Sequence, residues 1–134
     1  MVITWLAYKL TRFKSRELKF RGRRLRVDIA DTLPKQLVGL MYRDSIGREE
    51  GMLFVFGRKS RWGIWMPNMN FGIDILWVSG SGKIVDIKKG VKPARSSFAS
   101  EVYKPRKAAK YVLEIASGAS DAYGMKIGDV IALG

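Results

Sequence analysis

The sequence predicts one mostly-β domain, built as a small β-sandwich, a jelly-roll-like fold or a partly closed barrel, with one or two short helices. Two apolar runs, 52–56 and 73–78, are too short for typical helices and are rich in aromatic and β-branched residues, so we interpret them as buried strands. Between residues 18 and 29, apolar side chains alternate with charged ones on either side of Gly22, which indicates a β-hairpin with one buried face. The turn-forming residues 79–82 and the apolar residues within 83–88 predict a second hairpin, formed with 73–78.

Length and composition favour a single domain over residues 1–134 and exclude several function classes. At 134 residues the chain is long enough to bury one sizeable core. No run approaches the roughly 20 consecutive apolar residues of a membrane-spanning helix, and the start lacks the basic region and cleavage site of a signal peptide, so we expect a cytoplasmic protein. Cysteine and histidine are both absent, which removes disulfides, the usual zinc and copper ligands, and Ser-His-Asp or Cys-His catalysis of the familiar kinds. We therefore predict no metal site and no cofactor.

The basic charge is the strongest bias in the composition. The chain carries 25 Lys and Arg residues against 12 Asp and Glu, and the excess gathers in residues 9–26 and 83–110. Scarce Gln and Asn beside abundant Lys and Arg is typical of a thermophile's protein. The alternation in the first hairpin predicts a water-facing row of basic side chains, formed by Lys19, Arg21, Arg24 and Arg26. This row is either a solvated edge whose charges prevent pairing with other sheets, or a surface for weak contact with nucleic acid or another polyanion.

The remaining elements follow in order along the chain. Asp31 or Thr32 caps a short helix near 32–42, which has Pro34 in its first turn and Leu33, Leu37, Leu40 and Met41 at helical spacing on one face. Gly39 lies within that face, where a missing side chain permits a strand to approach closely. About eight strands are expected in all. The later segments include a short strand at 62–66 and strands at 111–115 and 130–133. An irregular loop is predicted at 90–108 and a helical turn at 117–123.

Several polar or amphipathic side chains stand within otherwise apolar motifs. Asn68 and Asp74 are set among apolar residues, and a buried amide or carboxylate costs free energy unless it has a partner or a functional role. Arg43 follows the apolar end of the helix, where it either pairs with a carboxylate or with free carbonyl groups, or grips an anion. Because side chains alternate along a strand, Trp62 and Trp65 cannot face the same side, and at least one indole should be partly exposed.

The order of the motifs carries a family resemblance. The motifs are Gly39-Leu40-Met41 followed by Arg43, the run GMLFVF at 51–56, Trp65-Met66 with Asn68, Ile73-Asp74-Ile75, Tyr111-Val112-Leu113-Glu114, Gly118, and Ile127-Gly128-Asp129. Over about residues 24–133 the chain resembles the domain of unknown function 192 family, which leaves 1–23 as a basic N-terminal extension forming a strand or hairpin. The resemblance implies a small mostly-β domain with short helices, and no established reaction. Relatives often carry Asn-Thr and Pro-Leu-Asp where this chain has Asn68-Met69 and Gly72-Ile73-Asp74.

The leading functional hypothesis is a non-catalytic module that binds a small polar or sugar-like ligand. The predicted ligand-binding residues are Arg43, Trp65, Asn68, Asp74 and Glu114. An alternative at the same site is a hydrolase that uses two carboxylates, although spacing along the chain does not show whether Asp74 and Glu114 meet. A third hypothesis is weak nucleic-acid binding through the basic hairpin. No catalytic residue is assigned, and the sequence does not indicate an oligomeric state.

Overall fold

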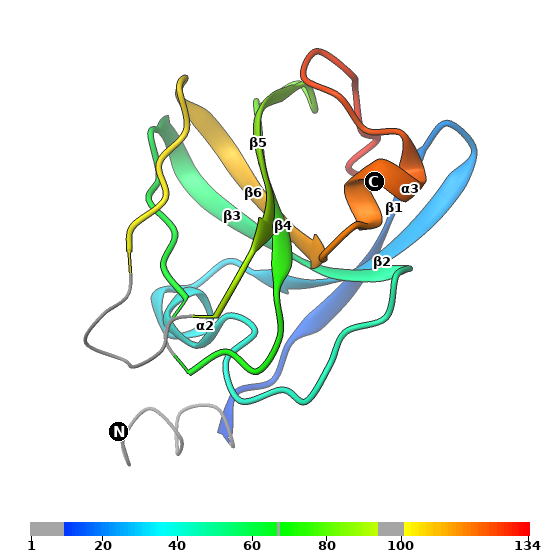
Figure 1. Ribbon diagram of the computed structural model, residues 1–134. Coiled ribbons are helices and arrows are strands. Elements are labelled where there is room, and N and C mark those ends of the chain that lie inside the picture. Colours follow the sequence, from blue (N-terminus) through cyan, green and yellow to red (C-terminus); the bar gives the residue numbers. More distant parts are fainter. Residues whose placement is uncertain (1–9, 67, 94–100) are drawn as a thin grey trace.

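The computed structural model describes residues 10–66, 68–93 and 101–134, which form one six-stranded sheet and two short helices (Figure 1). The elements in chain order are β1 (Lys14–Phe20), β2 (Arg23–Ala30), α2 (Leu33–Val38), β3 (Glu50–Ser60), β4 (Ile73–Val78), β5 (Ile84–Val91), β6 (Ala109–Ala116) and α3 (Ala119–Tyr123). The predicted mostly-β class with short helices is therefore confirmed. The predictions for 1–9 and for 94–100 of the irregular loop lie outside the described residues.

The strands lie in the order β1-β2-β3-β6-β4-β5. The two predicted hairpins are present, since β1 pairs antiparallel with β2 and β4 pairs antiparallel with β5. Strand β3 instead runs parallel to β2, and α2 lies in the crossover connection that parallel pairing requires. Strand β6, distant in sequence, inserts between β3 and β4 and pairs antiparallel with both. The β3–β6–β4 unit thus forms the centre of the sheet.

The C-terminal segment after α3 lies between the two edges of the sheet (Figure 1). Lys19 of β1 forms a bridge with Ala132, and Lys83, just before β5, forms a bridge with Val130. These bridges are isolated, so the sheet curves toward a barrel and remains open. The predicted strands at 130–133 and 62–66 are reduced to such bridges, which gives six strands in the described residues where about eight were expected. Alternating side chains do not make a strand unless a neighbouring backbone supplies consecutive hydrogen-bonding partners.

Each face of the sheet carries its own core. One core contains Leu18, Leu25, Val27, Leu53, Leu113 and Ile115, and it is covered by α3 and the C-terminal segment through Tyr123, Met125 and Ile131. The other core contains Met52, Phe54, Ile75, Trp77 and Val112, and it is covered by Leu40, Ile64 and Met66. Strand β4 is buried at every position, because both of its faces meet a core. The short apolar runs of the sequence are therefore strands covered on both sides.

Helix α2 begins as the sequence predicted and ends earlier. The Thr32 hydroxyl accepts a hydrogen bond from the backbone N–H of Lys35, and Pro34 occupies the first turn. The helix ends at Val38 because Gly39 adopts a positive φ of 50°, and a Cβ there would lie 3.3 Å from the Phe54 ring of β3. The predicted apolar face is only partly buried, since Leu40 is covered while Leu33 and Leu37 are exposed.

A buried carboxylate, Asp74 of β4, joins three elements on the α3 side of the sheet. It is fully buried and accepts hydrogen bonds from the backbone N–H of Gly90 at 2.9 Å and of Gly118 at 3.3 Å. It also accepts from the backbone N–H of Ser120 at 3.0 Å and from the Ser120 hydroxyl at 2.6 Å. No side chain of its own segment caps α3, so Asp74 satisfies a free N–H at the start of that helix from another strand. Asp74 therefore has a structural role.

Asp86 of β5 holds the connection before β6 in a similar way. Its buried carboxylate accepts hydrogen bonds from the backbone N–H groups of Arg106 at 2.8 Å and Ile87 at 2.9 Å, and from the Arg106 guanidinium at 3.2 Å. Burial alone would raise the pKa of Asp86, but these hydrogen bonds and the positive charge of Arg106 hold it below its ordinary value. Both carboxylates on strands β4 and β5 are thus satisfied by named partners.

We expect Asp74→Asn to destabilise the fold strongly. The amide group of Asn offers donors where the site already presents donors, so at least one buried N–H or O–H would lose its acceptor. The free energy of unfolding should fall by about 2–4 kcal/mol, measured by guanidinium denaturation. The matched control is Asp121→Asn, which changes an exposed carboxylate paired with Lys89 and should leave the unfolding free energy nearly unchanged. Equal effects of the two substitutions would contradict the role assigned to Asp74.

Candidate functional site

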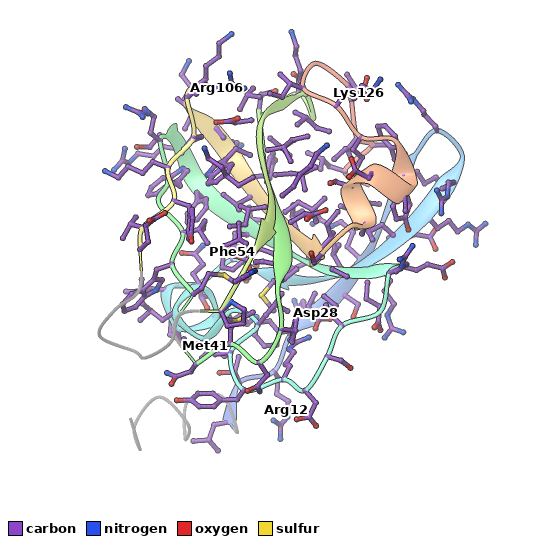
Figure 2. All side chains as sticks on the ribbon, in the orientation of Figure 1. Arg12, Asp28, Met41, Phe54, Arg106 and Lys126 are labelled. Atoms are coloured by element: carbon purple, nitrogen blue, oxygen red, sulfur yellow. The ribbon has the colours of Figure 1, made fainter. Side chains whose placement is uncertain are left out.

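A pocket of about 470 Å³ opens between α2, β3 and the segment 62–66. Its walls are mostly apolar, and they include Leu37 of α2, Leu40, Phe54 and Phe56 of β3, and Trp65. Met41 and Phe54, two of the lining residues, are labelled in Figure 2 on the side of the sheet that carries α2. The polar side chains that line it are Asp31, Gln36 and Glu114. A concave, apolar site with a few polar groups is the usual form of a small-molecule site.

Glu114 is the most unusual residue of this pocket. It lies on β6 between Met52 of β3 and Ile75 of β4, and the residue is only 4% exposed. Among the described residues no hydrogen bond or ion pair reaches its carboxyl group, in contrast to Asp74 and Asp86. Burial raises the pKa of Glu114 to about 8, because the charged form loses hydration without gaining a partner. The carboxyl group is therefore largely protonated at neutral pH.

The two tryptophans of the pocket, Trp62 and Trp65, differ in how accessible their rings are to a ligand. Trp62 stacks on Phe56 with ring centroids 4.2 Å apart, and its indole N–H donates to the backbone carbonyl of Arg58. Trp65 is 50% exposed and lines the pocket, which agrees with the partly exposed indole that the alternation predicted. Within the described part of the chain, Trp65 has no aromatic or cation–π partner. Its ring is thus available to a ligand.

Arg43 lies outside this pocket. Its guanidinium is 3.0 Å from the carboxylate of Asp28 and lies 5.3 Å from the ring centre of Phe13. Together with Asp28, Arg26 and Glu50 it lines a separate polar hollow of about 170 Å³. Of the two roles considered from the sequence, the structure places Arg43 as a carboxylate partner.

Asn68 is next to the pocket without lining it. Its backbone has a positive φ of 55°, and its carbonyl accepts a hydrogen bond from the Tyr42 N–H at 3.0 Å. Its side-chain amide lies 3.8 Å from the sulfur of Met41, which does line the pocket. Asn68 therefore joins its own segment to the chain that follows α2.

Asp74 and Glu114 point to opposite faces of the sheet. Asp74 is opposite Ile115 and Glu114 is opposite Ile75 in the β4–β6 pairing, so the two carboxylates differ by one residue in register. A shift of one residue reverses the face to which a strand side chain points. The structure thus brings Glu114 and Trp65 together in one pocket and separates them from Arg43 and Asp74. The single pocket that the sequence predicted around Arg43, Asn68 and Asp74 does not form.

Sequence reasoning missed several pocket residues. The helical spacing of Leu33 and Leu37 predicts that both are buried, whereas they are exposed and form part of the pocket wall. The sequence indicates Asp31 only as a candidate helix cap and gives no signal that Gln36 lines a pocket. These residues all lie within the helix or just before it. Their spacing along the chain does not show that the helix ends at Val38 and leaves this face partly uncovered.

The predicted basic row is present in three of its four members. Lys19 is opposite Arg24 and Glu17 is opposite Arg26, so these side chains share the exposed face of the first hairpin. Arg21 does not belong to this face, because β1 ends at Phe20 and Arg21 occupies the turn with φ of 50°. Its guanidinium reaches Asp129 at 3.1 Å. In the second basic block, Lys88 and Lys89 lie on β5, at the opposite edge of the sheet.

Two features are absent from the described residues, an acidic cluster for a metal ion and a helix that could span a membrane. Across 10–66, 68–93 and 101–134, no group of three or more acidic side chains comes close enough together to hold a metal ion. No helix in the same ranges is both long and apolar enough to cross a membrane.

Two of the most similar curated relatives come from thermophilic archaea. A UPF0127 protein of Thermococcus sibiricus is 32% identical over 108 residues, which cover 79% of this chain and 64% of the relative. A UPF0127 protein of Pyrococcus abyssi is 27% identical over 120 residues, which cover 88% of this chain and 92% of the relative. The chain thus spans somewhat less than two thirds of the Thermococcus protein.

Solved structures show the same fold. A protein of Sinorhizobium meliloti, described as a "putative transcription regulator", matches with a TM-score of 0.81 and 28% identity, covering 90% of this chain and 95% of that one. A protein of unknown function from Novosphingobium aromaticivorans matches with a TM-score of 0.75 and 26% identity, covering 89% and 84%.

The family model extends the match that the sequence motifs indicated. The model for domain of unknown function 192, described as an uncharacterized ACR, matches residues 16–133. It therefore includes most of β1, which the motif comparison had left outside. Because the match covers most of the chain, this protein belongs to the domain of unknown function 192 family.

Proposed function

We propose that this protein is a non-catalytic module that binds a small, largely apolar ligand in the pocket between α2, β3 and the segment 62–66. The observation that carries the proposal is a 470 Å³ pocket with apolar walls and one buried, unpaired carboxyl group, Glu114. A pocket of this size accommodates a small organic molecule and falls within the usual range of ligand sites.

The lining favours an apolar or aromatic ligand over the sugar-like ligand expected from the sequence. A sugar presents hydroxyl groups around its whole ring, and each buried hydroxyl needs a hydrogen-bonding partner. The amide nitrogen of Gln36 already donates to the carbonyls of Ala30 at 3.2 Å and Val55 at 3.0 Å. Asp31 and Glu114 are then the principal polar groups of the pocket, and Asp31 is paired with Lys35. These groups suit a ligand with one polar end.

The energetics of Glu114 support a functional role. A buried carboxyl group without a partner destabilises the folded state, while an apolar side chain at the same position would complete the core around Met52 and Ile75. Perturbed titratable groups in clefts are concentrated at functional sites. The hydrolase hypothesis has less support, because Asp74 lies on the opposite face and cannot act as the second carboxylate beside Glu114.

A second candidate function is contact with nucleic acid through the first hairpin. The supporting observation is that Lys19, Arg24 and Arg26 share one exposed face of β1 and β2. The pair between Arg24 and Glu17 is long, at 3.6 Å, and both side chains are exposed, so it offers little competition to a phosphate. The description of the Sinorhizobium protein is compatible with this candidate. Three basic groups support only weak, salt-sensitive binding.

The pocket can be tested with the neutral fluorescent dye N-phenyl-1-naphthylamine. We expect saturable binding of one dye per chain, because the pocket provides apolar walls and the exposed Trp65 ring. Trp65→Ala should weaken binding several-fold, as measured by dye fluorescence titration. The control is Ile127→Ala, which truncates a half-exposed apolar side chain outside the pocket and should not change the affinity. Equal losses in the two variants, or binding that does not saturate, would refute the pocket assignment.

The pH dependence of stability should report the unpaired Glu114. Between its unfolded pKa of 4.5 and its folded pKa of about 8, the folded state keeps a proton that the unfolded state releases. Stability should therefore fall as pH rises through this window and level off above about pH 8. The loss is roughly 3–5 kcal/mol. Glu114→Gln removes this titration, so the difference in unfolding free energy between the two proteins isolates Glu114. If the difference in unfolding free energy between Glu114→Gln and the unaltered protein stays constant from pH 5 to pH 9, the Glu114 carboxyl group has an ordinary pKa.

The nucleic-acid candidate predicts a steep but limited salt dependence. Three phosphate contacts correspond to a loss of about 40-fold in affinity for a DNA duplex between 50 and 200 mM salt. Arg24→Glu with Arg26→Glu should abolish the binding. Lys104→Glu with Lys107→Glu makes the same change in net charge in the other basic block and should have a much smaller effect, as measured by fluorescence anisotropy. Equal losses would mean that net charge, and not the hairpin, attracts DNA.

A further inference from the structure

The ionisable residues that line the pocket are of the opposite type to those that predominate in the chain. The chain carries 25 Lys and Arg residues against 12 Asp and Glu. Among the described lining residues, however, the charged types are Asp31 and Glu114, and neither Lys nor Arg contributes to the wall. The predominant basic residues are thus absent from this lining, and the pocket wall presents no Lys or Arg side chain to repel a positively charged ligand.

The aromatic residues of the pocket are also suited to a cation. Phe54, Phe56, Trp62 and Trp65 all line it. Phe54, Phe56 and Trp62 form a stacked row, with ring centroids 6.4 Å and 4.2 Å apart. Trp65 stands apart from this row and is half exposed. The faces of aromatic rings carry negative electrostatic potential, and tryptophan attracts cations most strongly.

Glu114 provides the specific contact that such a cation would make. Its neighbours in register are the apolar side chains of Met52 and Ile75, and the other titratable group on the pocket wall, Asp31, is paired with Lys35 at 3.5 Å. An ammonium group entering the pocket would give the buried carboxyl group an ion pair with hydrogen bonds. Such charge-assisted hydrogen bonds are the strong class.

We propose that the pocket selects an amphiphilic monocation, namely a primary or secondary amine carried on an aromatic or branched aliphatic body. The ammonium group pairs with the Glu114 carboxylate, and the apolar body lies against Trp65 and the Phe54–Phe56–Trp62 row. This inference rests on the proposed function and specifies its ligand class. The neutral carboxyl group gives up its proton to solvent as the pair forms, while the amine keeps its own, so each binding event releases one proton.

Proton release follows from the burial of Glu114. With a pKa of about 8 in the empty pocket, Glu114 is mostly protonated at pH 7, and a bound cation favours the ionised form. Close to one proton should therefore be released for each amine bound at pH 7. The affinity for the amine should rise with pH and level off above about pH 8, since an alkylamine stays protonated up to about pH 10.

Three probes of similar shape separate the contribution of the ligand's charge to the affinity from the contribution of its apolar body. They are 2-phenylethylamine, 2-phenylethanol and 3-phenylpropionate, which are cationic, neutral and anionic at pH 7. Isothermal titration calorimetry of the full chain, in phosphate and in Tris buffer, gives the affinity and the number of protons released. We expect the amine to bind about tenfold more tightly than the alcohol or better, with the carboxylate weakest. Proton release should accompany the amine alone.

Two variants locate the selectivity. Glu114→Gln should reduce the amine affinity to that of the alcohol and remove the proton release, while binding of N-phenyl-1-naphthylamine persists. Asp121→Asn, which neutralises an exposed carboxylate outside the pocket, should leave the amine preference in place. If Glu114→Gln fails to fold, the rise of amine affinity between pH 6 and pH 8 in the unaltered protein tests the same assignment.

The outcomes distinguish this inference from the proposed function. If the dye binds but the amine and the alcohol bind equally, the cation proposal is wrong and the apolar pocket stands. If neither the dye nor any of the three probes binds, both proposals fail. Amine selectivity that survives Glu114→Gln would overturn the assignment to Glu114. An amine affinity that does not change from pH 6 to pH 8 would also overturn it.

Discussion

The structure depends on a central unit of three strands, β3, β6 and β4, in which residues 51–54, 112–115 and 73–78 are buried on both faces. Side chains alternate along each strand, so successive residues enter different cores. Leu113 and Ile115 of β6 pack toward α3 and the C-terminal segment, whereas Val112 and Glu114 face the side of α2 and residues 62–66. A polar residue at one of these buried positions has no route to bulk water along the sheet. It must therefore find a partner on its own face or remain unsatisfied.

The carboxylates of Asp74 and Glu114 show both outcomes of this constraint. Asp74 receives four hydrogen bonds, because the start of α3 and the backbone of Gly90 present donors to that face. Glu114 faces the apolar side chains of Met52 and Ile75 and a pocket. Burial is nearly equal for the two residues, so burial alone does not separate a structural carboxylate from a functional candidate. What distinguishes the two carboxyl groups is the supply of hydrogen-bond donors on the face of the sheet to which each one points.

The positive charge and the pocket belong to different parts of the molecule. The exposed face of the first hairpin carries Lys19, Arg24 and Arg26 at one edge of the sheet, and Lys88 and Lys89 of the second basic block lie on β5 at the other edge. The pocket wall, by contrast, contains acidic and aromatic side chains. The amino-acid composition gives only the total charge of the chain and does not show how the charge is divided between these regions. Relatives from Thermococcus and Pyrococcus agree with the thermophile-like composition. A thermophilic background normally raises Glu together with Lys and Arg, however, and this chain has 25 Lys and Arg residues against 12 Asp and Glu.

The sequence by itself determined the fold class, both hairpins, a helix cap at Asp31 or Thr32, the close approach of a strand to Gly39 and the family, because each depends on local periodicity, turn residues or contiguous motifs. It also indicated that Asp74 and Glu114 were unusual, since polar residues within apolar strands are visible without a structure. Only the tertiary structure decided that the two carboxylates face opposite ways. That outcome depends on the register of β4 against β6, strands separated by more than thirty residues in the sequence. It likewise decided that Arg43 pairs with Asp28 and that Leu33 and Leu37 line a pocket, because these contacts are made between segments whose distance in space is not encoded in their spacing along the chain.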